Sequence, residues 1–286
     1  MKIARAPALY FILLVVCGTL AAAALLFTPA GGQQHGPYLG FDRNDYPGDE
    51  AMTQLRKTFS YTGYWLSPPP GTTTNSWSGK RATVAARGFG FLLLFNGKLY
   101  RELKASGNAR LTGRQDAAAA VNAAHTEGFR RGAVIFLDQE EGGRMLPEQF
   151  AYIEAWSDAV RAAGFVPGVY CSGMEVHDKG DPVTTTAADL REKLGAKQVK
   201  IWVANDQCPP SPGCSYGKPV PAPSASGTHD ALVWQFAQSP RRPRLTRNCA
   251  STYDADGSCY APGLPHGPNS YVDLNTSTSA DPSNGR

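Results

Sequence analysis

The chain has 286 residues, of which 42% are hydrophobic and 18% are charged, a balance typical of globular proteins rather than disordered or coiled-coil ones. Its formal net charge is +4, and Lys2 and Arg5 supply two of these charges, which leaves +2 for the rest of the chain. This excess is too small for a dedicated nucleic-acid-binding protein, because such proteins present a strongly basic face. Six cysteines are too few for a small disulfide scaffold and are wrongly spaced for zinc. We expect neither a cofactor nor a metal ion.

The first 36 residues are interpreted as an export leader. Residues 1–5 are basic, residues 6–27 carry no charge, and the uncharged stretch includes a run of small residues at 21–24, as in a signal peptide. The stretch also reaches the length needed to span a bilayer, so an uncleaved membrane anchor stays open as the alternative. Either outcome predicts a secreted or otherwise extracytoplasmic protein. Residues 37–276 would form one barrel domain, and residues 277–286 a polar tail that we expect to fray.

Four cysteines in two loop segments are expected to form disulfides, because export leads to an oxidising compartment. Cys208 and Cys214 lie in one Pro/Gly/Ser-rich segment, and Cys249 and Cys259 lie in another. Three pairings are possible; the local pairs Cys208–Cys214 and Cys249–Cys259 close the shortest loops and are therefore expected. Four free thiols are the alternative. Cys171 lies in an apolar run and is expected to be a small buried residue.

Eight short apolar segments recur after residue 36, and most are continuously apolar, like strands of a parallel sheet covered on both faces. They are residues 38–42, 61–67, 88–96, 133–140, 165–172, 199–206, 231–237 and 271–276. Helices are predicted at 49–59, 112–128, 147–164 and 184–195; that at 112–128 opens at Thr112 and closes at Gly128. This alternation predicts an α/β protein with a (β/α)8 TIM-type barrel, in which an irregular insertion at 208–228 replaces one outer helix. An open doubly wound sheet is the alternative, although no Gly-rich phosphate loop follows the first strand.

Acidic residues lie near the ends of several predicted strands, where a barrel of this kind holds its active site. Asp138 and Glu140 are two positions apart on one strand, so both side chains point into the mouth of the barrel. Carboxylates crowded in a partly desolvated cleft raise each other's pKa, which makes one of them a proton donor near neutral pH. Asp42 and Asp273 lie on the first and last strands, which become neighbours when the barrel closes. These four are the candidate catalytic residues for glycoside cleavage, with structural roles in the loops as the alternative.

Aromatic and polar side chains near the same strand ends are the candidate substrate-binding residues, because aromatic faces stack on the apolar faces of sugar rings. The set is Trp65, Tyr170, Trp202, Asn205, Asp206, Trp234, Gln235 and Asn275. An ordinary core position is the alternative for each aromatic residue. After the seventh predicted strand, Arg241, Arg242, Arg244 and Arg247 either hold an anionic polymer near the mouth or belong to a solvated loop.

Six short motifs, taken in order, resemble those of a known family. They are Gly-Phe-Asp at 40–42, Asp-Gln-Glu at 138–140, Gly-Val-Tyr at 168–170, Ile-Trp-Val-Ala at 201–204, Val-Trp-Gln at 233–235 and Val-Asp-Leu-Asn at 272–275. They are similar to motifs of Chalaropsis-type lysozymes, which are secreted barrels that cleave peptidoglycan after N-acetylmuramic acid. The resemblance is closer still to the glycoside-hydrolase-like domain family of exported envelope proteins, over residues 37–276. It implies Glu140 as general acid/base, Asp138 as the residue that orients the substrate N-acetyl group or acts as electrostatic partner, and Asp42 and Asp273 as the rest of an acidic pocket.

Together these features predict an exported glycoside hydrolase-like protein that acts on cell-envelope glycan of the N-acetylated, peptidoglycan type. Its expected partner is cell-wall polysaccharide; we expect a monomer, and residues 6–27 would provide any membrane attachment. A catalytically silent barrel that binds envelope saccharide is the alternative. A metal-dependent deacetylase or phosphodiesterase would need histidine ligands, and only His177 directly follows a predicted strand.

Overall fold

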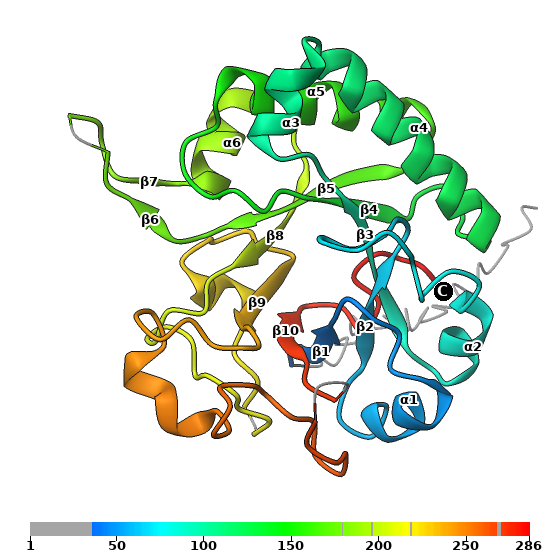
Figure 1. The fold of residues 1–286 in the computed structure, drawn as a ribbon, viewed down its shortest axis with the longest axis vertical. Coiled ribbons are helices and arrows are strands. Elements are labelled where there is room, and N and C mark those ends of the chain that lie inside the picture. The colour runs from blue at the N-terminus through cyan, green and yellow to red at the C-terminus, as the bar shows by residue number, and fades with distance from the viewer. Residues whose placement is uncertain (1–35, 179, 196, 218, 268–269) are drawn as a thin grey trace, which may run out of the picture. The chain divides into compact units, whose positions relative to one another are not determined.

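The computed structural model describes residues 36–178, 180–195, 197–217, 219–267 and 270–286. They form a closed eight-stranded barrel with helices packed outside it (Figure 1). The barrel strands are β1 (Tyr38–Asp42), β2 (Tyr61–Trp65), β3 (Gly90–Asn96), β4 (Val134–Asp138), β5 (Val166–Ser172), β8 (Lys200–Ala204), β9 (Val233–Ala237) and β10 (Asp273–Ser277). Residues 1–35, which contain almost all of the predicted leader, lie outside the described residues. Within the part of the chain that is described, no helix is long and apolar enough to cross a membrane.

The helices lie mainly on the side of the barrel formed by β2 to β5 (Figure 1). They are α1 (Asp49–Leu55), α2 (Arg81–Ala86), α3 (Tyr100–Ser106), α4 (Ala109–Glu127), α5 (Pro147–Ala162) and α6 (Thr186–Leu194). A short hairpin of β6 (Glu175–Val176) and β7 (Thr184–Thr185) projects between β5 and α6. Among the described residues, the connection from β8 to β9 holds only the 3-10 turn η1 (Pro223–Ser226), as the predicted insertion implies, and the connection from β9 to β10 holds only η2 (Arg247–Thr252).

The predicted TIM-type barrel is confirmed, with one difference in strand direction. Each of the eight predicted strands is present, and seven run parallel in the order β1, β2, β3, β4, β5, β8, β9. The last strand, β10, closes the barrel antiparallel to both β9 and β1, with Asp273 opposite Asp42 and Ser277 opposite Tyr38. We call the end at which the seven parallel strands finish the mouth. Since β10 runs the other way, its first residue lies at the mouth and its last at the base.

The helix predicted at 112–128 is present but begins earlier than expected. α4 starts at Ala109 because the Asn108 side chain accepts a hydrogen bond from the Leu111 N–H at 3.0 Å, which caps the helix upstream of the predicted cap at Thr112. α4 and α5 pack closely: a Cβ atom at Gly113 would lie 2.4 Å from the backbone of α5. Only glycine permits this approach of the two helices.

The C-terminal tail does not fray as expected but packs against the base of the barrel. The Ser283 hydroxyl accepts a hydrogen bond from the Leu93 N–H at 2.9 Å, and the Ser283 carbonyl accepts one from the Val134 N–H at 2.8 Å. A Cβ atom at Gly90 would lie 2.0 Å from the Ala280 carbonyl oxygen, so the tail backbone sits directly on β3. The antiparallel course of β10 explains this position, because it delivers the tail to the base, where strand N–H groups need acceptors.

The two disulfides join the two loop segments instead of closing each one locally, so the expected local pairing is wrong. They are Cys208–Cys249, with a Cα–Cα distance of 5.8 Å, and Cys214–Cys259, with 5.3 Å. Chain entropy favours short loops, but the fold lays the two segments side by side; the Cys208 N–H donates to the Leu245 carbonyl at 3.0 Å. Cys171 is free and buried, as expected.

Candidate active site

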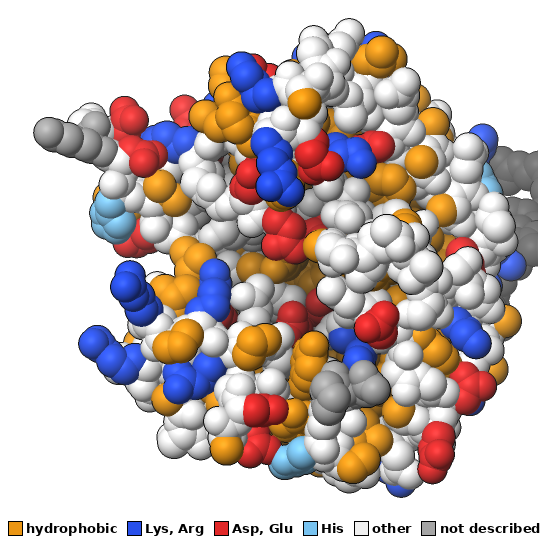
Figure 2. Space-filling view, viewed as in Figure 1, with side chains coloured by type: hydrophobic (Ala, Val, Ile, Leu, Met, Phe, Trp, Pro, Cys, Tyr) orange, Lys and Arg blue, Asp and Glu red, His pale blue; other side chains and the backbone are white. Residues whose placement is uncertain are grey.

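The four predicted acids meet at the mouth of the barrel. Asp42 ends β1, Asp138 ends β4, and Glu140 follows two residues later. Asp273 is the first residue of β10 and faces Asp42 across the β1–β10 pair. The face in Figure 2 is hollowed near its centre, and acidic side chains gather there.

Asp138 and Glu140 form a pair in which one carboxyl group is buried and the other reaches solvent. Asp138 is only 3% exposed, and its Oδ1 atom has no hydrogen-bond partner within the described part of the chain. Burial and then the negative charge of Glu140 raise the pKa of Asp138 well above its usual value. Desolvation also raises the pKa of Glu140, against a hydrogen bond from Asp138 that lowers it. The pair therefore retains a proton that an exposed carboxylate would lose.

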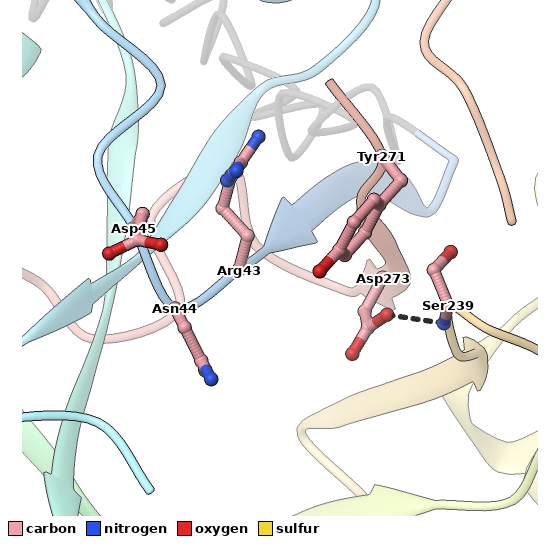
Figure 3. A pocket seen from close by; sticks show the side chains of 6 residues that line it. All are labelled: Arg43, Asn44, Asp45, Ser239, Tyr271 and Asp273. Carbon is pink, nitrogen blue, oxygen red and sulfur yellow. Dashed lines mark hydrogen bonds between the residues drawn. The ribbon is translucent and has the colours of Figure 1, made fainter. Parts of the chain in front are cut away.

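Asp42 and Asp273 accept hydrogen bonds from side-chain amides and a backbone N–H group. The Asp42 Oδ1 atom accepts hydrogen bonds from Gln235 Nε2 at 2.9 Å and from Asn275 Nδ2 at 2.6 Å, yet burial raises the pKa of Asp42 to about 6. Asp273 accepts from the Ser239 N–H at 2.7 Å (Figure 3). Burial, followed by the charge of Asp42, raises the pKa of Asp273 well above its usual value. A developing positive charge at the mouth would therefore meet several carboxyl groups.

Glu140 lies on the border between two cavities. One cavity, of about 210 Å³, is also lined by Asp138 and by Asn96, Lys98 and Arg101, which lie just beyond or at the end of β3. The other cavity, of about 300 Å³, lies on the side of β5, the end of β8 and the segment after β9. It is lined by Gln139, Glu140, Gly142, Tyr170, Ser172, Met174, Ala204, Gln238 and Arg242. A ligand that spans both cavities would pass directly over Glu140.

A third, smaller cavity of about 130 Å³ adjoins Asp273 (Figure 3). Arg43, Asn44 and Asp45, which follow β1, form one wall, and Tyr271 and Ser239 stand on the other side. In the close-up, Tyr271 and Asp273 project from neighbouring positions toward the open space, whereas the Arg43 guanidinium points away from Asp273. This cavity extends the polar surface of the mouth.

Tyr170 takes its predicted place, but the three predicted tryptophans do not. The Tyr170 hydroxyl group donates to Gln235 Oε1 at 2.8 Å, and its side chain lines the larger cavity beside Glu140. Trp65, Trp202 and Trp234 are at most 3% exposed. Their indole N–H groups are used inside the protein, for example by Trp202 to Asn275 Oδ1 at 2.9 Å. The expectation that these rings stack on sugar is therefore corrected: they are core residues.

The predicted polar residues act mainly by holding other parts of the site. Gln235 and Asn275 hold Asp42, as described above. Asn205 donates to the Ser226 carbonyl at 2.8 Å and so fixes the insertion after β8. Asp206, 1% exposed, forms an ion pair with Arg242, whose Nε lies 3.0 Å from Asp206 Oδ2. The expectation of direct substrate contact is corrected for these buried side chains.

Sequence reasoning missed the residues that line the cavity of about 210 Å³ on the β3 side of Glu140. Asn96, Lys98 and Arg101 lie at and beyond the end of the third strand, which carries no motif of the family. Their position after a barrel strand is the signal that points to them, because strand ends surround the mouth.

No metal site is evident. Among the residues that the structure describes, no group of three His, Cys, Asp or Glu side chains is arranged to hold a metal ion. His177 is exposed beside the β6–β7 hairpin, and its Nε2 atom lies 3.5 Å from Glu175 Oε2.

A closed α/β barrel with carboxyl groups gathered at its mouth has the architecture of many glycoside hydrolases. The family model described as "Rv2525c-like, glycoside hydrolase-like domain" matches residues 64–214. The chain belongs to this family, which confirms the resemblance indicated by the six motifs.

Solved structures similar to this chain include three from bacteria. An uncharacterized B. stearothermophilus protein is 18% identical with a TM-score of 0.53, covering 84% of this chain and 95% of its own. The Tat-secreted protein Rv2525c of Mycobacterium tuberculosis is 13% identical with a TM-score of 0.49, covering 87% and 98%. The bacterial lysozyme of Streptomyces coelicolor is 13% identical with a TM-score of 0.46, covering 86% and 93%. The first likeness shows a shared fold. No curated protein matches the chain.

Proposed function

We propose that this protein is an exported glycoside hydrolase that cleaves N-acetylated glycan of the cell envelope, with Glu140 as its general acid/base. The position of Glu140 carries the proposal: it borders both cavities at the mouth, with the buried Asp138 directly behind it. A residue that protonates the oxygen between two sugars has to stand between the sites that hold those sugars. Membership of a glycoside hydrolase-like family supports this chemistry.

The proposed reaction uses the proton that Asp138 and Glu140 share. Glu140 gives this proton to the glycosidic oxygen as the bond from that oxygen to the anomeric carbon breaks, which leaves both carboxyl groups ionised. The acetamide oxygen of the substrate then bonds to the anomeric carbon, while the Asp138 carboxylate holds the acetamide N–H. Water next attacks the anomeric carbon, releases the acetamide and returns its proton to Glu140. Asp42 and Asp273 stabilise the positive charge on the sugar ring.

The disulfides support an extracytoplasmic location, because such bonds form and persist in oxidising compartments. Cell-wall polysaccharide is the proposed partner, met by the protein as a monomer. A silent barrel that only binds saccharide is the second candidate. The gathering of four acids at one mouth favours the hydrolase, because glycoside cleavage needs both a proton donor and a carboxylate that stabilises positive charge.

The test is hydrolysis of purified peptidoglycan and of chitin-type oligomers, followed through the appearance of new reducing ends. Glu140→Gln keeps the size of the side chain but removes the transferable proton, so turnover should fall by about 10²–10⁴-fold while glycan binding persists. Substrates with good leaving groups should partly restore turnover in Glu140→Gln and not in Asp138→Asn, because such leaving groups need no proton.

Glu192→Gln is the matched control, since Glu192 is an exposed acid on α6 and lies outside the three mouth cavities. Wild-type turnover in Glu140→Gln would overturn the assignment. Binding of glycan without hydrolysis by the wild-type protein would favour the silent barrel.

A further inference from the structure

Four arginines follow β9 and lie along one side of the mouth. Arg241, Arg242, Arg244 and Arg247 all fall within seven residues, which we call the arginine loop. Arg242 lines the cavity of about 300 Å³ that Glu140 borders. Figure 2 shows basic side chains gathered at the edge of the central hollow, over the same region in which Figure 1 places the segment after β9. The arginine loop therefore places positive charge beside the acidic residues of the mouth.

Arg242 is oriented by a buried partner. Its Nε atom lies 3.0 Å from Asp206 Oδ2, its Nη2 atom bonds the other carboxylate oxygen, and Nη2 also lies 3.6 Å from Met174 Sδ. Asp206 is 1% exposed, so this ion pair fixes the guanidinium plane firmly. Among the described residues nothing bonds the Nη1 atom, so Arg242 still has a free donor edge next to the cavity.

Arg244 and Arg247 carry charge that the described protein does not neutralise. Both are exposed, and within the described ranges no carboxylate oxygen lies within 4.0 Å of either guanidinium group. Some other arginines of this chain do have acidic partners: Arg110 lies 2.6 Å from Glu154 Oε2, and Arg191 lies 2.8 Å from an aspartate. Positive charge therefore accumulates beside the mouth rather than being balanced there.

The loop backbone is held in place, so these charges are positioned in advance. The disulfide between Cys208 and Cys249 ties the end of the loop to the insertion after β8. The Leu245 carbonyl accepts from the Cys208 N–H at 3.0 Å, and the Arg241 N–H donates to the Gly257 carbonyl at 2.6 Å. A preorganised cationic surface loses less conformational entropy when it binds a ligand.

We propose that the arginine loop binds anionic oxygen groups, carboxylate or phosphodiester, that the glycan carries on the side of Glu140 occupied by the larger cavity. The proposal rests on the proposed function and deepens it, because it makes the substrate an anionic rather than a neutral glycan. Guanidinium groups suit both anions, since their paired N–H donors match two oxygens at once. A neutral glycan would offer Arg244 and Arg247 no charge with which to pair.

Binding is measured on the full chain carrying Glu140→Gln, so that hydrolysis does not intervene. The probes are soluble uncross-linked peptidoglycan chains, the same chains with methyl-esterified carboxylates, and a glycerol-phosphate polymer. Arg244→Gln with Arg247→Gln should raise Kd for the charged chains by about three- to tenfold, the size expected for two exposed ion pairs. Kd for the esterified chains should not change. High salt should weaken binding of the charged chains, and weaken it less in the double variant.

Arg114→Gln with Arg130→Gln is the control, because it removes the same charge from exposed positions on α4 and at the base of the barrel. Comparison of the carboxylate and phosphodiester probes identifies which anion the loop prefers. Equal binding of charged and esterified chains, with an unchanged Kd in the double variant, would overturn the proposal and leave the hydrolase intact. Charge-dependent binding without hydrolysis by the wild type would retain the anion site and reject the hydrolase. Binding of no probe would reject both.

Discussion

The disulfide Cys208–Cys249 offers a sharp test of the fold, because its pairing is not the one that chain entropy favours. It closes a loop with a sequence separation of 41. The loss of denatured-state entropy on closing a loop of this length is worth up to about 4 kcal/mol at 25 °C, against about 2 kcal/mol for a local Cys208–Cys214 bridge. Cys208→Ser with Cys249→Ser should therefore lower the free energy of unfolding by up to about 4 kcal/mol. The second bridge restrains the same region and keeps the loss below that limit.

Unfolding by guanidinium chloride without reductant measures this loss, and a peptide map checks the pairing directly. Trypsin leaves Cys208 and Cys214 together in residues 201–241, and Cys249 and Cys259 together in residues 248–286. The two peptides should stay linked until a reductant is added. The double variant should show no more free thiols than the wild type after denaturation. Separate peptides from unreduced protein, or two additional thiols in the variant, would refute the pairing.

Two further predictions concern stability. The pKa of Asp42 is raised to about 6 from 3.8, so its contribution to stability is complete below pH 3.8 and is lost as the pH rises through 6. The change in unfolding free energy caused by Asp42→Asn should therefore be more favourable at pH 7.5 than at pH 4, by up to about 3 kcal/mol. An equal change at both pH values in urea unfolding would contradict this. Ser283→Ala leaves the buried Leu93 N–H without its acceptor and should cost about 1–3 kcal/mol in the same assay, whereas Thr278→Ala, at an exposed site, should cost little. Equal costs for these two variants would refute a structural role for the tail.

The sequence was sufficient to predict the barrel and its acidic centre. Eight apolar segments at regular intervals specify strands, and the spacing of Asp138 and Glu140 placed both acids at one strand end, where the structure has them. The direction of β10 could not be predicted in this way, because the pattern of a short strand reads the same for either direction. Asp273 was expected near Asp42 from adjacency of strands, and this holds only because β10 starts at the mouth.

The prediction that Trp202 and Trp234 contact the substrate is wrong for two different reasons. Trp234 and Gln235 are consecutive on one strand, so their side chains point to opposite sides. Gln235 bonds Asp42 inside the barrel, and Trp234 therefore faces outward and is buried. Trp202 is fully buried, and its indole N–H donates to Asn275 Oδ1, so the ring is part of the core. The alternation of side chains along β9 could have excluded Trp234 as a ligand contact. The burial of Trp202 could not be predicted in this way, because it depends on how the loops cover the mouth.

The reversed direction of β10 also exchanges the roles of the two loops that flank it. In a barrel of parallel strands, each loop after a strand shapes the ligand site and each loop before it serves stability. Around β10 these two roles are reversed. Tyr271, just before the strand, lines the cavity beside Asp273, whereas the segment after Ser277 packs against the base of the barrel. Amino-acid changes just upstream of β10 should therefore alter ligand preference, and changes just downstream should alter thermal stability. Directed evolution of this barrel would then select specificity mutations before the strand and stabilising mutations after it.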